Sequence, residues 1–293
     1  MRVKIPIYMG LVLLLLSPIH GVLAGGNIQT GIALFDQTNY QKAYEYFEDI
    51  ELENKNNPEY HYYYGLSLYK TDQAKDAVEA MKRAVELEPQ NPDYQFALAL
   101  IYLLRVGEVN VFRKPGMFGK LKKSMIQAAE HEPTYLPGYL FYTGWLLYAP
   151  GIGGGDVEKG KKYLEKLKDV SEADWLRLEA GLANRDENYA KAEELYLKSI
   201  EMEPSPRSFI SIARYYLERK QYDQAISYAD SFNRLSKRWS DPGDSDGHLV
   251  LSEAYYYLGD KANFEAHSEK AISMSENEAQ KERFETSLGE LGD

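Results

Sequence analysis

The 293-residue chain contains no cysteine and has few basic residues for its number of acidic ones. The absence of cysteine excludes disulfides, thiolate metal sites, cysteine nucleophiles and a lipid-modified N-terminal cysteine. Lys and Arg number 34 against 45 Asp and Glu, which gives a net charge of −11. Because affinity for nucleic acids depends on cationic side chains that displace counterions from phosphates, this charge argues against a nucleic-acid partner.

Sequence motifs typical of enzymes and metal sites are missing as well. The chain has no Gly-x-Ser-x-Gly elbow, no His-Glu-x-x-His pair and no glycine-rich loop ending in Gly-Lys-Ser/Thr. No two of the five histidines stand at ligand spacing on one predicted helix face. We therefore expect no enzyme activity, no catalytic residue, no bound metal and no cofactor.

One acidic segment resembles part of a calcium loop. Residues 244–247 read Asp-Ser-Asp-Gly, and Glu253 follows at the spacing of the last calcium ligand. The first ligand position of such a loop falls on Pro242, whose side chain cannot coordinate an ion. Glu253 also fits a helical pattern that begins near His248, so we expect a turn before a helix here.

The first 24 residues predict a secretory signal peptide. Arg2 and Lys4 precede an apolar run that includes residues 11–16, and Val22-Leu23-Ala24 supplies a cleavage site before Gly25. The alternative is an uncleaved membrane anchor, but a span needs about 20 predominantly apolar residues and this run is shorter. We expect residues 25–293 to be exported and to contain no transmembrane segment.

Small and bulky residues recur along the exported part at a fixed spacing. From Gly65, matching positions lie 3, 12, 16, 19 and 24 residues later, at Leu68, Ala77, Met81, Ala84 and Pro89. The same offsets begin at Ala180, and most of them begin at Gly31, Ala213 and Ser252. A small residue lets two antiparallel helices approach closely, and bulky residues fill the space between them. The spacing predicts tandem helix–turn–helix units.

This pattern resembles the tetratricopeptide repeat (TPR), a helix–turn–helix unit of 34 residues. Pro58 and Pro92 lie one such period apart. The resemblance implies an all-α, right-handed solenoid of about seven repeats that covers residues 25–293 as a single domain. The polar stretch 276–288 predicts a C-terminal capping helix, which an open-ended repeat array requires.

Two repeats carry extra residues in the turn between their helices, at 106–119 and 149–156. Because consecutive repeats stack in parallel, both turns should emerge on the same edge of the solenoid, and such insertions often mark a binding face. The segments 117–121 and 149–156 are similar to a subgroup of exported bacterial TPR proteins with a PGI-x-GG loop. This resemblance implies a periplasmic location.

The aromatic residues of three neighbouring repeats predict a ligand-binding groove. The first helix of each TPR lines the concave surface, which places these residues on the groove: Tyr62, Leu66, Tyr69, Phe96, Leu100, Phe141, Trp145 and Tyr148. The inserted edge beside the groove consists of Phe112, Met117, Phe118, Pro150, Gly151, Gly153, Gly154 and Asp156. Large aromatic side chains with a polar tip are common at binding hot spots. The alternative is that these residues pack against one another inside a tight superhelix.

We therefore expect a non-enzymatic adaptor of the bacterial cell envelope that binds a protein or peptide in the groove and along the inserted edge. Such an adaptor could associate with an envelope complex. The alternative function is a small-molecule module that holds a lipid-like or aromatic ligand for an envelope transport or assembly system.

Overall fold

The computed structural model describes residues 27–130, 135–275 and 278–292, and the regular structure in these ranges is entirely helical. The predicted signal peptide, residues 1–24, lies outside the described residues. None of the helices in the described ranges is long and apolar enough to cross a bilayer.

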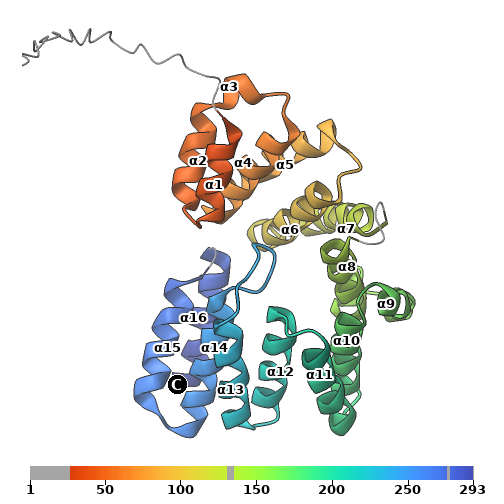
Figure 1. Ribbon diagram of the computed structural model, residues 1–293, viewed down its shortest axis with the longest axis vertical. Helices are drawn as coiled ribbons and strands as arrows, with labels where there is room; N and C mark the ends of the chain where they lie inside the picture. The colour runs from red at the N-terminus through yellow and green to blue at the C-terminus, as the bar shows by residue number, and fades with distance from the viewer. Residues whose placement is uncertain (1–26, 131–134, 276–277, 293) are drawn as a thin grey trace, which may run out of the picture.

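Seven antiparallel helix pairs follow one another along the described chain (Figure 1). They are α1 (Ile28–Asp36) with α2 (Tyr40–Asp49), α4 (Pro58–Lys70) with α5 (Ala74–Leu87), α6 (Pro92–Glu108) with α7 (Lys114–Glu130), α8 (Leu136–Tyr148) with α9 (Val157–Val170), α10 (Glu172–Arg185) with α11 (Tyr189–Met202), α12 (Pro206–Glu218) with α13 (Tyr222–Asn233), and α14 (Asp244–Leu258) with α15 (Lys261–Ser273). The helix α16 (Glu278–Gly292) closes the array and buries Phe284 completely. Two short elements, α3 (Glu51–Asn54) and the 3-10 helix η1 (Gly151–Gly153), lie in connections. The prediction of an α-solenoid of seven TPR-like repeats with a capping helix is confirmed.

The helices α4 and α6, which begin one repeat apart, have the same N-terminal capping arrangement. Asn57 caps α4 by accepting a hydrogen bond from the Glu59 amide at 3.0 Å, and Asn91 caps α6 in the same way through the Asp93 amide at 3.1 Å. A proline follows each asparagine, at the first helical position, where its missing N–H costs nothing.

The turns inside the regular repeats share one backbone conformation. Thr38, Asp72, Glu187 and Lys220 all have φ of 59–60°, the left-handed region that L-residues rarely adopt. The amide after each of these residues bonds back to a carbonyl in the last helical turn, as from Gln73 to Leu68 at 2.9 Å. This turn reverses the chain and sets the second helix against the first.

Close contacts at small residues explain the repeat spacing. A Cβ added at Gly31 would lie 2.5 Å from Cζ of Phe47, and one at Gly65 would lie 3.2 Å from Cε of Met81. In the fourth repeat a Cβ added at Gly144 would meet no atom of another element within 4 Å, so Gly144 is not the site of a close helix contact. There the close approach occurs at Gly160, where an added Cβ would lie 2.7 Å from Cδ2 of Leu147.

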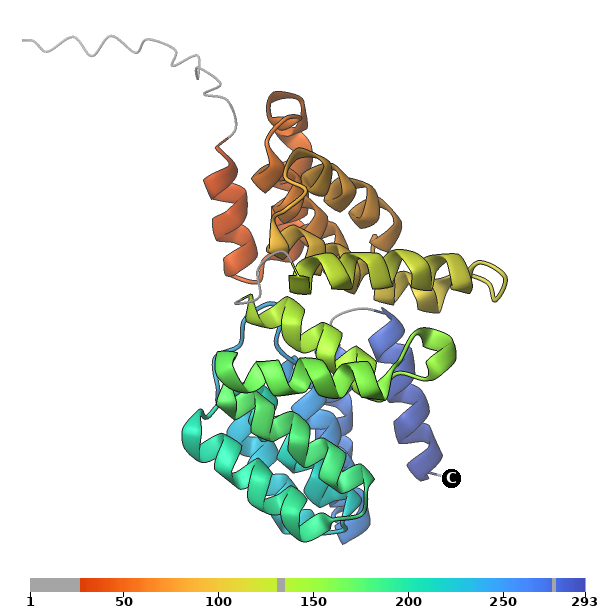
Figure 2. The same cartoon turned by 90° about the vertical axis from the view of Figure 1, so that its right-hand side faces the viewer.

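The first insertion lengthens two helices rather than forming a long turn. Of residues 106–119, only 109–113 are outside α6 and α7, each of which has 17 residues against 13 in α4. Met117 and Phe118 pack against the core, which favours helix in a stretch that also contains three glycines. The second insertion does lie in the connection between α8 and α9. Both connections project on the same side of the solenoid in Figure 2.

Most of the buried apolar residues form two clusters, one from Ile32 to Leu182 and one from Ala180 to Leu251. The superhelix nevertheless brings its ends together, and α14–α16 lie across from α1 and α2 (Figure 1). The Glu278 amide at the start of α16 donates to Oδ1 of Asp72 in the second repeat at 3.0 Å. The concave side of the solenoid is therefore bounded by repeats from both ends of the chain.

Candidate ligand-binding cleft

Residues 234–243 connect α13 to α14 and run across the concave face of the N-terminal repeats; we call this segment the 234–243 loop. Its half-buried Trp239 lies against two of the eight predicted groove residues, which we call the aromatic wall. The ring centroid of Trp239 is 6.5 Å from that of Tyr62 and 5.8 Å from that of Phe96. Trp239 belongs to the periphery of the N-terminal apolar cluster, although the chain around it belongs to the C-terminal repeats. The loop therefore joins the two halves of the solenoid.

Ion pairs hold the 234–243 loop in place. Arg207 of α12 donates to the Ser240 carbonyl and to Oδ1 of Asp241, each at 3.0 Å. The other carboxylate oxygen of Asp241 accepts from the Arg238 amide at 2.9 Å, which folds the loop on itself. Burial lowers the pKa of Arg207, but a guanidinium remains charged in proteins. Lys237 is anchored separately by Asp244 and by the carbonyls of Phe232 and Leu235.

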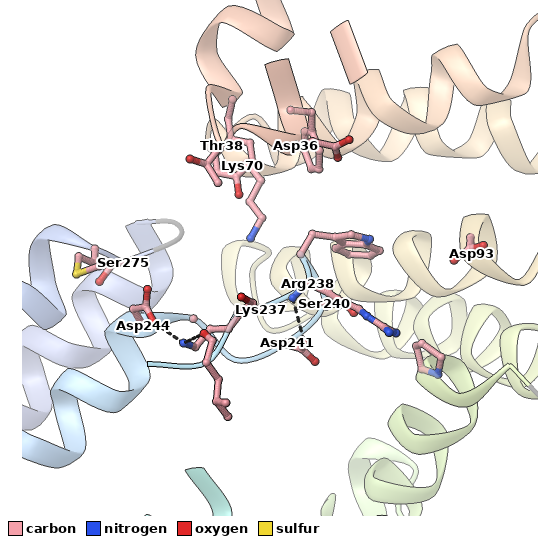
Figure 3. A pocket seen from close by; sticks show the side chains of 18 of the residues that line it. Asp36, Thr38, Lys70, Asp93, Lys237, Arg238, Ser240, Asp241, Asp244 and Ser275 are labelled. Carbon is pink, nitrogen blue, oxygen red and sulfur yellow. Dashed lines mark hydrogen bonds and ion pairs between the residues drawn. The ribbon is translucent and has the colours of Figure 1, made fainter. Parts of the chain in front are cut away.

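A cleft of about 1330 Å³ opens beside this loop. Its walls come from the α1–α2 turn, the end of α4, the residues before and at the start of α8, the 234–243 loop and residues 273–275 after α15. Figure 3 shows Lys70 extending from the upper wall toward the loop, with Ser275 to the left. Such a volume is large enough for a short peptide segment or a drug-sized ligand.

The charged side chains that line the cleft differ in the contacts that they make. Tyr135 donates to Oδ1 of Asp93 at 2.7 Å, and burial together with this carboxylate raises the pKa of Tyr135. The Lys70 ammonium lies 5.7 Å from the ring of Tyr40, a cation–π arrangement. The Arg238 side chain is exposed to solvent in the loop. The cleft thus presents cationic groups on two facing walls.

The structure packs several predicted groove residues into the interior. Tyr62, Leu66 and Phe96 are buried, and Phe141 meets Phe96 edge to face at 5.8 Å. Burial raises the pKa of Tyr62. Leu100 and Tyr69 are half-buried. Tyr62 and Phe96 therefore take the internal-packing alternative, with Trp239 as the covering group, and contact of this wall with a ligand stays a prediction.

The remaining two predicted groove residues lie apart from Trp239. The indole Nε1 of Trp145 donates to the Gly153 carbonyl at 3.1 Å, and its ring lies 6.1 Å from that of Phe118. The Tyr148 side chain is exposed, but its hydroxyl donates to the Leu178 carbonyl at 3.1 Å. The predicted continuous wall is thus divided into a part beneath Trp239 and a part beside the insertions.

The inserted edge contains both packed and exposed residues. Met117 and Phe118 are half-buried, whereas Phe112 is 91% exposed at the tip of the α6–α7 turn. In the second insertion Pro150 and Gly151 are exposed, and Gly153 and Gly154 are half-buried beside Trp145. Oδ1 of Asp156 accepts a hydrogen bond from the Lys159 amide at 3.0 Å, which makes Asp156 the N-cap of α9.

The sequence analysis missed Trp239 and a contact between two histidines. Nδ1 of His248 lies 2.9 Å from Nδ1 of His267, and the two residues come from adjacent helices rather than one helix face. The unusual length of the connection between α13 and α14 was the available signal for the loop.

The acidic residues near 244–253 have protein partners. Asp246 accepts from Arg214 at 2.6 Å, and Asp244 pairs with Lys237. Burial raises the pKa of Glu253, within α14. Within the described ranges, no three His, Asp or Glu side chains are grouped as metal ligands would be.

Comparisons with known proteins agree with this architecture. Residues 34–101 match the family model described as "Tetratricopeptide repeat". A TPR repeat-containing protein of Methanocaldococcus jannaschii is 26% identical over 196 residues, which are 64% of this chain and 32% of that protein. The chain therefore spans about a third of the length of this relative.

Two solved structures illustrate the likeness of fold. A tetratricopeptide repeat protein from Parabacteroides merdae is 14% identical with a TM-score of 0.59, and the match covers 91% of this chain and 97% of that one. The APC/C hetero-tetramer Cut9-Hcn1 gives 14% identity and a TM-score of 0.54, with 89% of this chain and 48% of that one covered. At these identities the likeness concerns the fold, which is a solenoid of tetratricopeptide repeats.

Proposed function

We propose that this tetratricopeptide solenoid is a non-enzymatic adaptor that binds an extended segment of a protein partner in the cleft beside the 234–243 loop. The observation that carries the proposal is Trp239 on the aromatic wall. The concave face already holds one non-helical stretch of polypeptide, through an aromatic side chain packed against Tyr62 and Phe96. Solenoids of this kind use their concave surfaces for extended ligands.

The charges of the cleft favour a partner segment with a carboxylate. Lys70 extends from one wall and the exposed Arg238 from the facing loop (Figure 3). A carboxylate between two cations gains charge-assisted hydrogen bonds that a neutral group would not. The chain as a whole is acidic, so this local pair would also orient an approaching acidic segment.

The engagement of three of the four cleft carboxylates supports a binding role over catalysis. Asp93 accepts from Tyr135, Asp241 pairs with Arg207, and Asp244 pairs with Lys237. A general acid or base needs a proton that can be exchanged with a substrate, whereas these three carboxylates are committed to hydrogen bonds or ion pairs within the protein.

A partner in the bacterial cell envelope is the further part of the proposal. It rests on the signal-like sequence of residues 1–24 and on the resemblance of the two insertions to exported proteins. Deletion of residues 2–24 should retain the protein in the cytosolic fraction of a bacterial host, whereas the full chain should reach the periplasmic fraction. Equal distribution of the two forms would contradict export by this segment.

Site-specific photocrosslinking tests the cleft. Met274 lines the cleft and is 45% exposed, and Met202 lies at the end of α11 outside the cleft with 47% exposure. The photoreactive amino acid p-benzoylphenylalanine is placed at each position in turn. We expect a discrete protein adduct from Met274 in envelope extracts and none from Met202.

Equal adducts at both positions, or none at Met274, would contradict the proposal. An adduct at Met274 whose added mass is that of a lipid or another small molecule would favour the alternative function of a small-molecule module. Lys70→Glu then tests the charge argument, because it should weaken a carboxylate-bearing partner and leave an uncharged one unaffected.

A further inference from the structure

The turn between α6 and α7 exposes two adjacent apolar side chains. Val111 is 68% exposed and Phe112 is 91% exposed, the latter the most exposed of the large apolar side chains identified in the described ranges. The lengthened helices α6 and α7 carry this turn beyond the neighbouring repeats (Figure 2). We call Val111 and Phe112 the apolar tip.

The segment around the apolar tip carries a net positive charge, whereas the chain as a whole is acidic. Residues 105–123 contain six basic side chains and one carboxylate, whereas the chain as a whole has a net charge of −11. The basic residues are Arg105, Arg113, Lys114, Lys120, Lys122 and Lys123. Arg105 pairs with Glu108, and in the part of the chain that the structure describes none of the other five has an ion-pair partner.

This combination fits a lipid surface better than a protein surface. A stable protein interface buries about 800 Å² on each partner, which two side chains at a turn cannot supply. A bilayer interface instead accepts a single aromatic side chain, because the headgroup region surrounds it on all sides. Anionic headgroups attract each nearby Lys or Arg independently of exact geometry.

We propose that the apolar tip inserts into the headgroup region of an anionic lipid membrane, with the basic residues of 105–123 facing the lipid phosphates. The acidic remainder of the molecule is repelled by the same surface, so the protein binds with the tip toward the membrane and with one orientation. The cleft beside the 234–243 loop is a different part of the molecule, and this inference does not depend on the proposed function.

The chain contains a matched control for the apolar tip. Leu52 of α3 is 87% exposed, close to the exposure of Phe112, but its neighbours in the sequence are Glu51 and Glu53. If exposed apolar area alone drove lipid binding, Leu52 and Phe112 would contribute alike. If the positive surroundings matter, only Phe112 contributes.

The experiment measures co-sedimentation of residues 25–293 with lipid vesicles, because the apolar run in residues 11–16 would itself bind lipid. All described helices lie within this range. The vesicles are phosphatidylcholine alone or phosphatidylcholine mixed with phosphatidylglycerol. We expect binding to the mixed vesicles only, with loss of binding near 1 M salt, where the Debye length is about 3 Å.

The variants then locate the contact. Phe112→Ser should lower affinity for the mixed vesicles by roughly tenfold or more, and Arg113→Glu by roughly fivefold or more, since each basic residue near the surface adds about that factor. Leu52→Ser should leave it unchanged. Circular dichroism checks that each variant is as helical as the parent protein.

Three results would overturn the inference. The parent protein could fail to bind the mixed vesicles, Leu52→Ser could weaken binding as much as Phe112→Ser, or phosphatidylcholine alone could bind as well. A dimer in sedimentation equilibrium that Phe112→Ser dissociates, in a protein that ignores vesicles, would assign the apolar tip to a second copy of the chain.

Discussion

At the scale of single residues, the contact between His248 and His267 restricts how the two rings can be protonated. Their Nδ1 atoms lie 2.9 Å apart, so one must donate and the other accept, and two imidazolium rings cannot both be accommodated. Burial lowers the pKa of both histidines below the ordinary value of 6.5, and His267 lowers that of His248 further. Lys270 acts in the same direction, whereas the carboxylates of Asp230 and Asp244 oppose it.

This arrangement predicts a loss of stability in mild acid. Because the folded pKa values are below the unfolded value, the folded state binds fewer protons than the unfolded state between them, and the free energy of unfolding falls as pH drops below about 6.5. Compared with His267→Gln, the parent protein should lose roughly 1 kcal/mol more between about pH 7.5 and pH 5. Urea unfolding at the two pH values measures the difference.

The comparison with His267→Gln is needed because burial also lowers the pKa of His61, which titrates in the same range in both proteins. Carboxylates common to both proteins cancel in the same way. An equal pH dependence in the two proteins would show that the histidine pair does not restrict protonation.

Trp239 is a second residue whose effect on stability can be stated. It is half-buried and contacts the rings of Tyr62 and Phe96. Trp239→Ala should lower the free energy of unfolding by about 2 kcal/mol, less than the roughly 3–5 kcal/mol for a fully buried tryptophan. Urea unfolding followed by circular dichroism provides the measurement. A change within experimental error would mean that the 234–243 loop does not stabilise the wall it covers.

At the scale of the elements, the turns inside the repeats hold side chains in an unfavourable backbone conformation. Thr38 has φ of 60° although it is β-branched, and the equivalent turn of the last repeat uses Gly259 with φ of 76°. Left-handed backbone costs a non-glycine residue about 1–2 kcal/mol, and glycine escapes this cost.

The two positions therefore predict opposite responses. Thr38→Gly should raise the free energy of unfolding by up to about 1 kcal/mol, while Gly259→Ala should lower it by about 1 kcal/mol. Thermal unfolding of the two single variants beside the parent protein measures both. Destabilisation by Thr38→Gly would show that contacts of the threonine side chain outweigh its backbone strain.

The elements also show why most of the fold could be predicted from the sequence. The offsets from Gly31 and Gly65 record contacts between neighbouring helices, such as Gly31 with Phe47 and Gly65 with Met81, which the structure contains. The length of α6 and α7 could not be inferred, because residues 106–119 include Pro115 and three glycines. The helical conformation of this segment depends on the packing of Met117 and Phe118 against the core, and the local sequence pattern carries no information about that packing.

At the scale of the whole molecule, the cleft was less predictable than the repeats. The residues of the aromatic wall follow from their place in each repeat, and Tyr62 and Phe96 do lie together. The covering Trp239 follows the sixth helix pair, whereas Tyr62 and Phe96 belong to the second and third. Its position depends on the accumulated rotation of successive repeats, and a small error in each repeat moves the end of a solenoid by a large distance.

The contacts that bring the two ends of the solenoid together can be separated from the contacts that fold each repeat. Two of the contacts between described residues join the halves across the cleft: Trp239 with the aromatic wall, and the Glu278 amide with Oδ1 of Asp72 at 3.0 Å. The stability of a repeat array comes mainly from contacts between neighbouring repeats, so these two long-range contacts should control shape more than folding.

Removing both contacts should therefore open the cleft without unfolding the helices. We expect the double variant Asp72→Gly, Trp239→Ala to have a larger radius of gyration in small-angle X-ray scattering and an unchanged helical signal in circular dichroism. Glycine suits the left-handed backbone of Asp72, with φ of 59°, so this substitution removes the acceptor without adding strain. Trp145→Ala removes a tryptophan that bonds to Gly153 beside the insertions and should leave the radius unchanged. An unchanged radius in the double variant would mean that contacts between neighbouring repeats alone hold the ends together, and the cleft would then be a fixed feature of the superhelix.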